Sequence, residues 1–191
     1  MKKGHSIYLF RHGRTKDNIN GRFSGWRDSK LVQSGKDDAK IVALRLKKKK
    51  IEAAFFTKLS RSKDTLKQVL KFHPECRILI EDNRIIERNY GNLNGMTHLE
   101  IVEKYGADKY DSWHRGFSAR PPKGESFADI EKRVKDFIKD LIKFMNKNNV
   151  NVAISAHGNS IRLFRKILEK KSEKEAVTWE IPYDKVFEYK I

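Results

Sequence analysis

The sequence has little of what marks secreted or membrane proteins. A single cysteine, Cys76, stands among 191 residues, so no internal disulfide can form and nothing indicates an oxidising compartment. No stretch approaches the roughly 20 consecutive apolar residues that a membrane helix needs. The strand-like run at residues 6–10 is too short for the apolar region of a secretory signal. We therefore expect a cytoplasmic protein without a membrane partner.

Acidic residues are scarce relative to basic ones. The 25 Asp and Glu stand against 42 Lys and Arg, which gives a formal net charge of +17 at pH 7. Such a charge attracts anions, from small phosphates to nucleic acids. No zinc-ligand spacing, basic zipper or aromatic RNA-binding signature accompanies it, and lysine runs such as residues 46–50 suit a solvated helix end. We therefore expect no nucleic-acid partner, and salt-dependent retention on DNA would contradict this expectation.

Short apolar runs alternate with amphipathic segments along the chain. The clearest periodicity begins at Phe127, from which apolar residues recur at steps of three and four as far as Met145 and predict one long helix. The alternation predicts a single α/β domain over residues 1–191, built around a largely parallel sheet. In the helix expected at 34–49, Ala39, Ile41, Ala43 and Leu44 are available for burial. Strands are expected at about residues 6–10, 53–56, 78–80, 150–155 and 185–190, further helices at about 60–72, 97–105 and 160–170, and loops at 14–33 and 82–96.

Two of the expected strands end in a histidine followed by glycine. The segments are Phe10-Arg11-His12-Gly13 and Ala156-His157-Gly158-Asn159. Ligands of open α/β sheets bind beyond the carboxyl ends of the strands. If the two strands are neighbours, both histidines converge on one pocket, and the glycines permit close backbone approach. A lone histidine is more often structural than catalytic, but two at equivalent strand ends favour a functional site.

Five segments, in order, resemble the motifs of the histidine phosphatase (phosphoglycerate mutase-like) superfamily. The resemblance covers essentially the whole chain and implies a three-layer α/β/α fold with a mainly parallel central sheet. The matching segments are residues 9–15 with Asn18, Ser60-Arg61 with Thr65, residues 87–95, residues 113–117 and residues 156–162.

The resemblance implies catalytic roles for five residues. His12 would attack phosphorus and form a phosphohistidine, which divides one difficult step into two easier ones. Arg11, Arg61 and His157 would clamp the phosphate, since guanidinium forks match phosphate oxygens. Glu87 would act as the general acid and would need surroundings that keep it partly protonated. His12 must present a neutral nitrogen, so we expect a backbone carbonyl to hold its other ring nitrogen. No metal is required.

The rest of a small anionic phosphorylated substrate would be held by a second set of residues. Segments 22–26 and 113–117 resemble those of cofactor-dependent phosphoglycerate mutases. They favour an enzyme of glycolysis and gluconeogenesis that interconverts 3- and 2-phosphoglycerate and is primed by 2,3-bisphosphoglycerate. The alternative is a phosphatase of the same superfamily, in which water takes the phosphoryl group. A phosphate-binding module without catalysis is disfavoured, because binding alone needs no acid at Glu87. The implied substrate-binding residues are Asn18, Ser24, Gly25, Arg88, Tyr90, His98, His114, Arg115, Gly158 and Asn159.

Two of these residues depart from the mutase pattern. His98 and His114 stand where the mutases commonly carry a lysine and an arginine. A histidine titrates near pH ~6.5, so we expect substrate affinity to weaken as the pH rises from ~5.5 to ~7.5. Whether the chain forms a homo-oligomer is left open by the sequence.

Overall fold

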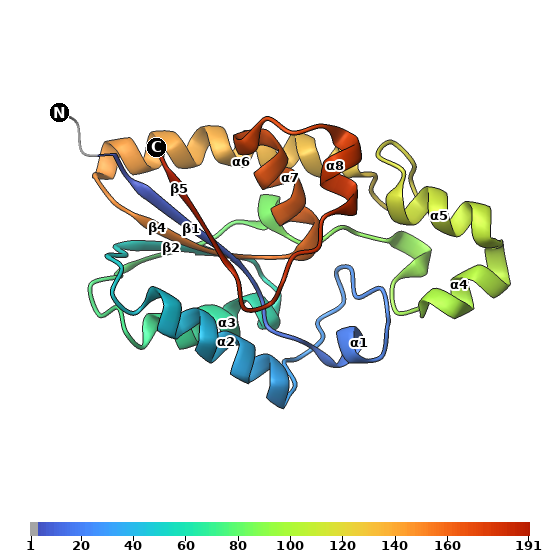
Figure 1. The fold of residues 1–191 in the computed structure, drawn as a ribbon, viewed down its shortest axis with the longest axis horizontal. Helices are drawn as coiled ribbons and strands as arrows, with labels where there is room; N and C mark the ends of the chain where they lie inside the picture. Colours follow the sequence, from blue (N-terminus) through green and yellow to red (C-terminus); the bar gives the residue numbers. More distant parts are fainter. Residues whose placement is uncertain (1–3) are drawn as a thin grey trace.

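The computed structural model describes residues 4–191, which form one twisted five-stranded sheet with helices on both faces (Figure 1). The strands are β1 (Ser6–Arg11), β2 (Ala53–Phe56), β3 (Ile78–Glu81), β4 (Val152–Ala156) and β5 (Val186–Lys190), in the spatial order β3-β2-β4-β1-β5. Neighbours are parallel except for β5, which pairs antiparallel with β1 at the edge. Every predicted strand is present, and the mainly parallel sheet is confirmed. Residues 1–3, which precede the segment considered as a signal, lie outside the described residues.

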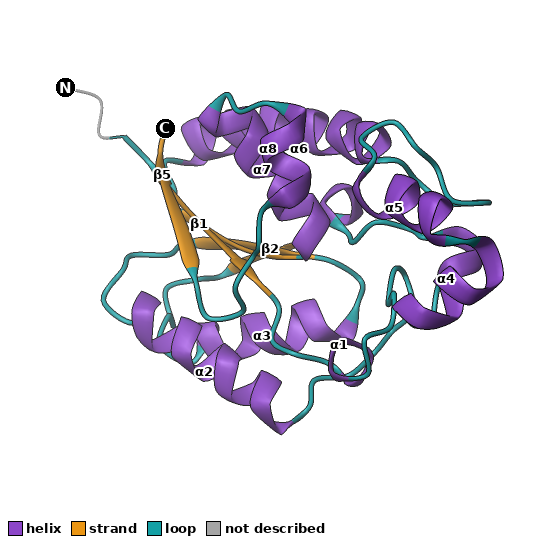
Figure 2. Ribbon diagram, turned by 45° about the vertical axis from the view of Figure 1, so that its right-hand side comes forward, coloured by secondary structure: helices purple, strands orange, loops and turns teal. Residues whose placement is uncertain are grey.

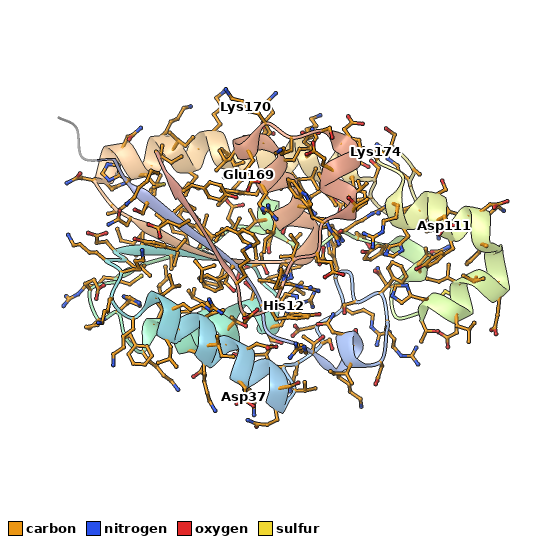
Figure 3. The ribbon with its side chains drawn as sticks, in the orientation of Figure 1. His12, Asp37, Asp111, Glu169, Lys170 and Lys174 are labelled. Atoms are coloured by element: carbon orange, nitrogen blue, oxygen red, sulfur yellow. The ribbon has the colours of Figure 1, made fainter. Side chains whose placement is uncertain are left out.

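The helices form one layer on each face of the sheet, which confirms the three-layer arrangement (Figures 1 and 2). One layer holds α6 (Phe127–Asn148), α7 (Gly158–Glu169) and α8 (Glu173–Thr178), and the other holds α2 (Gln33–Leu46) and α3 (Ser60–Leu70). Each layer closes its own apolar core against one face of the sheet. Many charged side chains point outward, as Lys170 and Lys174 do in Figure 3, in agreement with a lysine-rich solvated surface. No helix among residues 4–191 is long and apolar enough to span a bilayer.

The helix expected from Phe127 runs as predicted. Its first turn is closed by a capping box between Ser126 and Asp129, and it ends where Asn149 adopts the left-handed conformation, with φ 54°. The prediction for α2 was wrong in part, because Ile41 and Leu44 are 41% and 61% exposed. The prediction is confirmed for Ala39 and Ala43, which are buried on the same helix as Val42 and Leu46.

Three helices were not predicted. They are α1 (Lys16–Ile19), which lies in the segment expected as a loop, α5 (Ala107–Arg115) and α8. In Figure 1, α5 and the predicted helix α4 (His98–Tyr105) extend to one side of the sheet. No residue of α5 is fully buried, although Tyr110 and Trp113 pack against an apolar cluster, and α1 and α8 are too short to show an apolar period. Helices α4 and α5 pack on a small apolar cluster that is separate from the two main cores and contains Phe23, Leu93 and Ile101.

The register between β1 and β4 places the two histidine motifs side by side. Arg11 lies opposite Ala156. His12, the first residue after β1, donates its backbone N–H to the Ala156 carbonyl over 3.1 Å. The expected adjacency of the two strands is therefore confirmed. Helix α7 begins at Gly158, two residues earlier than predicted, so His157 is its N-cap residue.

Candidate active site

His12 is buried just beyond the end of β1, near the middle of the molecule (Figure 3). Its Nδ1 lies 2.8 Å from the carbonyl oxygen of Gly13, as expected from the sequence. When Nδ1 donates to that carbonyl, Nε2 carries the free lone pair. Gly13 is required here because a Cβ would come within 2.0 Å of the Gly35 carbonyl oxygen, where the chain crosses the start of α2. The local backbone therefore selects the tautomer that a nucleophile needs.

The electrostatic surroundings keep His12 neutral. Burial lowers the pKa of its imidazole well below the usual value, and the guanidinium groups of Arg61 and Arg11 lower it further. Burial in the first place and Arg61 in the second also lower the pKa of His157 well below its usual range. The two rings lie with their centroids 5.0 Å apart. Both imidazoles are therefore uncharged at neutral pH in the ligand-free enzyme.

Two arginines are fixed beside His12 by backbone carbonyls. Arg61 is fully buried and donates from Nη1 to the Arg27 carbonyl (2.7 Å) and from Nη2 to the Gly25 carbonyl (2.8 Å). Arg11 donates from Nη1 to the Ile181 carbonyl over 2.9 Å. In each side chain the Nε–H is buried without a hydrogen-bond partner among the described residues. Buried polar groups are normally paired, so these two donors require an acceptor that a ligand supplies.

Two further buried polar atoms in the site also lack a hydrogen-bond partner among the described residues. His157 Nε2 lies 2.9 Å from Thr57 Oγ1, and Nδ1 has no partner within residues 4–191. If the Thr57 hydroxyl donates to Nε2, Nδ1 carries the ring proton as a free donor. Ser24 Oγ, which belongs to a residue lining the same cavity, is also buried and unpaired within the described part of the chain. Four polar atoms around His12 are thus prepared for the oxygens of a tetrahedral anion.

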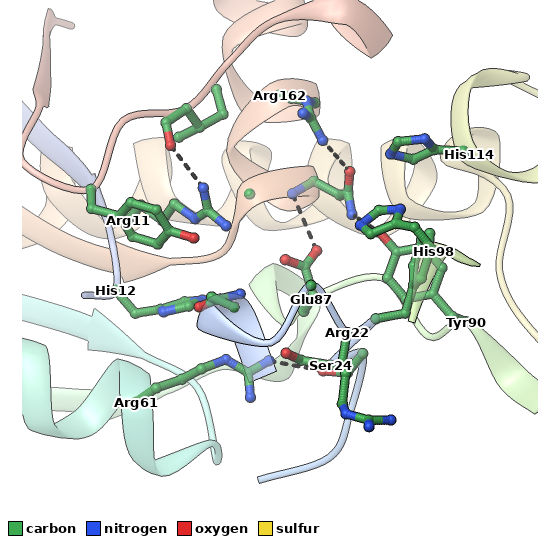
Figure 4. Close-up of a pocket in the computed structure, with 18 residues that line it drawn as sticks. Arg11, His12, Arg22, Ser24, Arg61, Glu87, Tyr90, His98, His114 and Arg162 are labelled. Atoms are coloured by element: carbon green, nitrogen blue, oxygen red, sulfur yellow. Dashed lines mark hydrogen bonds between the residues drawn. The ribbon is translucent and has the colours of Figure 1, made fainter. Parts of the chain in front are cut away.

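Glu87 is buried at the centre of this cavity (Figure 4). Its Oε1 accepts hydrogen bonds from the backbone N–H groups of Arg88 (2.8 Å) and Asn159 (3.2 Å). Its backbone carbonyl is fixed by the indole N–H of Trp26 over 2.8 Å. A Cβ at residue 158 would lie 3.6 Å from Glu87 Oε2 and 3.6 Å from Arg11 Cζ. Gly158 therefore keeps open the space between the Glu87 carboxyl group and the Arg11 guanidinium.

The cavity, of about 240 Å³, extends from this centre to an aromatic wall. Ring centroids lie 4.4 Å apart for Phe23 and Tyr90, 4.7 Å for Phe23 and His98, and 5.4 Å for His98 and His114. His98 Nδ1 is also 2.8 Å from the Tyr110 hydroxyl. Eight of the ten predicted substrate-binding residues line the cavity: Asn18, Ser24, Gly25, Tyr90, His98, His114, Gly158 and Asn159.

The expected titration of the two histidines near pH ~6.5 needs correction. Burial lowers the pKa of His114 to about 3, helped by the nearby Arg115. Burial and Arg115 also lower the pKa of His98. His114 is therefore neutral throughout the range in which we expected affinity to change, and a proton on His98 is disfavoured there. Neither ring replaces the permanent cation of a lysine or an arginine.

Arg88 and Arg115 do not line the cavity, in contrast to the prediction. The guanidinium of Arg88 is buried and donates to the carbonyls of Glu125 (2.7 Å) and Ala119 (3.1 Å). Arg115 is exposed and donates to the Val177 carbonyl over 2.7 Å, which ties α5 to α8. Both arginines join backbone segments that lie far apart in the sequence.

Six residues that line the cavity were not among the predicted site residues: Gly21, Arg22, Phe23, Arg162, Ile181 and Tyr183. Arg162 lies one turn after Gly158, and this spacing would have indicated it had the start of α7 been placed correctly. Tyr183 lies in the connection before β5, and its ring covers Arg11 with the guanidinium carbon 3.9 Å from the centroid. No pattern in the sequence indicates Tyr183. Arg22 was part of a matching segment but was not assigned a role.

One ligand atom each from His12, Glu87 and His157 lies within 4.8 Å of the others, close enough to reach one metal ion. However, the guanidinium groups of Arg61 and Arg11 that disfavour a proton on His12 also disfavour a metal cation. The charge of the site favours a phosphate over a cation.

The fold is that of a three-layer α/β protein, and its cavity is lined by four arginines and a buried histidine. The chain belongs to the histidine phosphatase superfamily (branch 1), whose family model matches residues 7–190. It is 34% identical over 169 residues to the 2,3-bisphosphoglycerate-dependent phosphoglycerate mutase of Cytophaga hutchinsonii, covering 88% of this chain and 79% of that protein. It is 33% identical to 2,3-bisphosphoglycerate-dependent phosphoglycerate mutase 2 of Gloeobacter violaceus, covering 93% and 81% of the two chains.

Solved structures share the fold at lower sequence identity. The structure of Bacillus stearothermophilus YhfR has a TM-score of 0.85 and 24% identity, covering 96% of this chain and 90% of that chain. A mycobacterial glucosyl-3-phosphoglycerate phosphatase has a TM-score of 0.79 and 23% identity, covering 92% and 84%. The fold is thus shared with a protein named as a phosphatase, whereas the curated relatives above are named as mutases.

Proposed function

We propose that this chain transfers phosphoryl groups through a phosphohistidine at His12. The observation that carries the proposal is the set of buried polar atoms without partners among residues 4–191 around His12, contributed by Arg11, Arg61, His157 and Ser24. A phosphoryl group bound to them would have its phosphorus beside the free Nε2 of His12. Removing two dispersed negative charges from water is costly unless such donors are already in place.

The reaction then follows from the geometry. His12 Nε2 attacks phosphorus in line, and the bond from phosphorus to the ester oxygen breaks as the bond to nitrogen forms. The departing oxygen takes a proton from the carboxyl group of Glu87. In the second half an acceptor hydroxyl gives its proton back to Glu87 and attacks the phosphohistidine, which restores neutral His12. Arg11 and Arg61 stabilise the charge on the transferred group throughout.

We propose further that the acceptor is a phosphoglycerate, so that the enzyme interconverts 3- and 2-phosphoglycerate in glycolysis and gluconeogenesis. Support comes from curated relatives named as mutases, at 30–34% identity and with 88–96% of this chain covered. The cavity also fits a bisphosphate primer, because arginines stand at both ends, with Arg11 and Arg61 near His12 and Arg22 and Arg162 further out. When bound, 2,3-bisphosphoglycerate supplies the phosphoryl group that charges His12.

One observation favours a phosphatase as the second candidate. Burial lowers the pKa of both His98 and His114, so the aromatic wall offers less charge to a second anionic group than a lysine and an arginine would. A weakly held acceptor would leave water to take the phosphoryl group.

The deciding experiment is phosphorus NMR of the enzyme with 3-phosphoglycerate, with and without a trace of 2,3-bisphosphoglycerate. Formation of 2-phosphoglycerate that depends on the primer supports the mutase. Inorganic phosphate without the isomer supports the phosphatase. His12→Ala should abolish both signals, whereas His5→Ala, at the opposite end of β1, should abolish neither.

A further inference from the structure

We infer that Arg162 binds a second anionic group of the substrate, a carboxylate or a phosphate, on the side of the transferred oxygen away from His12. This inference rests on the proposed function and names the class of substrate that the site accepts. The preferred substrate is a phosphomonoester whose alcohol part carries its own negative charge.

The first argument is that Arg162 is partly buried and has no counter-ion among the described residues. Its Nε donates to the Trp179 carbonyl over 2.8 Å, and Nη1 donates to Asn159 Oδ1 over 2.6 Å. Among residues 4–191 no carboxylate lies within 4.0 Å of it, and Nη2 makes no hydrogen bond. Burial lowers its pKa to about 10, so the group is still a cation at neutral pH. A buried charge without a partner is destabilising, so its retention indicates that a ligand supplies the anion.

The second argument is the charge balance of the cavity. Its lining contains the arginines Arg11, Arg22, Arg61 and Arg162, and Glu87 is the acidic residue in that lining. A bound phosphoryl dianion compensates Arg11 and Arg61. Arg22 is near Glu100, with Nη1 and Oε2 3.5 Å apart, and donates to the backbone at Gly95. Arg162 is then the cation that remains uncompensated.

The third argument concerns position. Figure 4 shows Arg162 entering from α7 on the same side of the cavity as His114, across from Arg61. Asn159 connects it to the catalytic centre, since its side-chain Oδ1 accepts from Arg162 and its backbone N–H donates to Glu87 over 3.2 Å. An anion held by Arg162 would therefore place the oxygen that departs or attacks next to Glu87. The neutral His114 cannot supply this charge.

The test compares substrates that share a phosphate ester and differ in the second group. These are 3-phosphoglycerate, which carries a carboxylate, 2,3-bisphosphoglycerate, which adds a phosphate, and glycerol 3-phosphate, which has hydroxyls instead. We measure binding by calorimetry in a His12→Ala background, and kcat/KM in the active enzyme. In Arg162→Gln the preference for the charged ligands over glycerol 3-phosphate should fall by about 10- to 100-fold, the range for hydrogen bonds to charged groups. Arg162→Lys should restore part of it.

The matched control is Arg165→Gln. Arg165 lies on the same helix and binds Glu169 over 2.9 Å, and Figure 3 shows Glu169 well away from His12. The Arg165→Gln enzyme should prefer the charged ligands over glycerol 3-phosphate as strongly as the unmodified enzyme does. An equal loss for 3-phosphoglycerate and the bisphosphate identifies the carboxylate that both carry as the ligand of Arg162, and a larger loss for the bisphosphate identifies its second phosphate.

Two results would overturn the inference. If Arg162→Gln weakens glycerol 3-phosphate as much as the charged ligands, Arg162 positions Asn159 and binds no anion. If the preference is unchanged, the second anion lies elsewhere. Because binding is measured without chemistry, the inference can be judged even if no phosphohistidine forms, and that outcome would count against the proposed function alone.

Discussion

Replacing Gly158 by alanine should raise stability and abolish activity together. Residue 158 is the first of α7 and lies outside the left-handed region. A Cβ there would be 3.6 Å from Arg11 Cζ, 3.7 Å from Arg11 Nε and 3.6 Å from Glu87 Oε2, all ordinary van der Waals distances. The methyl group therefore fits the ligand-free enzyme. Since alanine loses less chain entropy than glycine on folding, the variant should gain about 0.5–1 kcal/mol of stability.

The same methyl group fills the space that the substrate needs. An ester oxygen that bonds both the Arg11 fork and Glu87 must lie about 3 Å from each, and the new carbon occupies that position. A displacement of roughly 1 Å in a phosphoryl-transfer geometry costs about 100-fold in rate. We expect kcat/KM to fall by at least that factor, with phosphohistidine formation reduced in parallel.

Thermal unfolding and single-turnover labelling of His12 measure the two effects. Gly106→Ala serves as the reverse control, because Gly106 has φ +87° and, beyond its chain neighbours, no atom of the described residues lies within 4 Å of the position that the methyl group would take. It should lose about 1–3 kcal/mol from backbone strain and keep its activity per folded molecule. A Gly158→Ala enzyme that is stable and still active within about threefold would refute our placement of the phosphoryl group.

Three further outcomes are expected. Glu87→Gln should slow reaction of alkyl phosphates about 100-fold or more but spare p-nitrophenyl phosphate, whose leaving group needs no proton. Thr57→Val, unlike Thr57→Ser, should lower kcat/KM about 10-fold because it releases the His157 ring, as steady-state kinetics would report. His114 has a folded pKa of about 3, below its unfolded value, so the stability that its neutral form contributes above pH ~6.5 is lost as the pH falls towards 3. Chemical unfolding of His114→Gln should therefore show about 1–2 kcal/mol less acid destabilisation at pH ~5 than the parent, and equal slopes would contradict this.

The catalytic end of the site could be predicted because it is encoded locally. His12 and His157 each follow a short apolar strand, and parallel strands present their carboxyl ends at the same edge. The glycine after each histidine indicated close packing before any contact was known. Even the carbonyl that holds His12 Nδ1 followed from the need for a neutral nucleophile.

The substrate-binding end could not be predicted in the same way, because its residues depend on tertiary contacts. Arg88 and Arg115 match the pattern by position, yet both are held by backbone carbonyls outside the cavity. Arg115 lies on α5, a short helix without a fully buried residue. The contact of Arg115 with α8 decides that its side chain lies outside the cavity, and no local sequence pattern predicts this contact.

The observed start of α7, two residues earlier than predicted, changes which residues of this helix face the cavity. With the helix beginning at Gly158, its first turns carry Gly158, Asn159 and Arg162 on one face, towards the cavity. Burial disfavours a proton on His98 and keeps His114 neutral, so the aromatic wall lacks two permanent cations. The partly buried Arg162 lies on the same side of the cavity as His114. The choice between mutase and phosphatase therefore depends on how firmly one guanidinium holds the acceptor against water. Adding a second cation on the side of Arg162 is the complementary change. In His114→Arg, the phosphoryl group on His12 should pass to phosphoglycerate more often and to water less often. A transfer-to-hydrolysis ratio that stays constant in this variant would mean that charge at this end of the cavity does not decide the fate of the phosphoryl group.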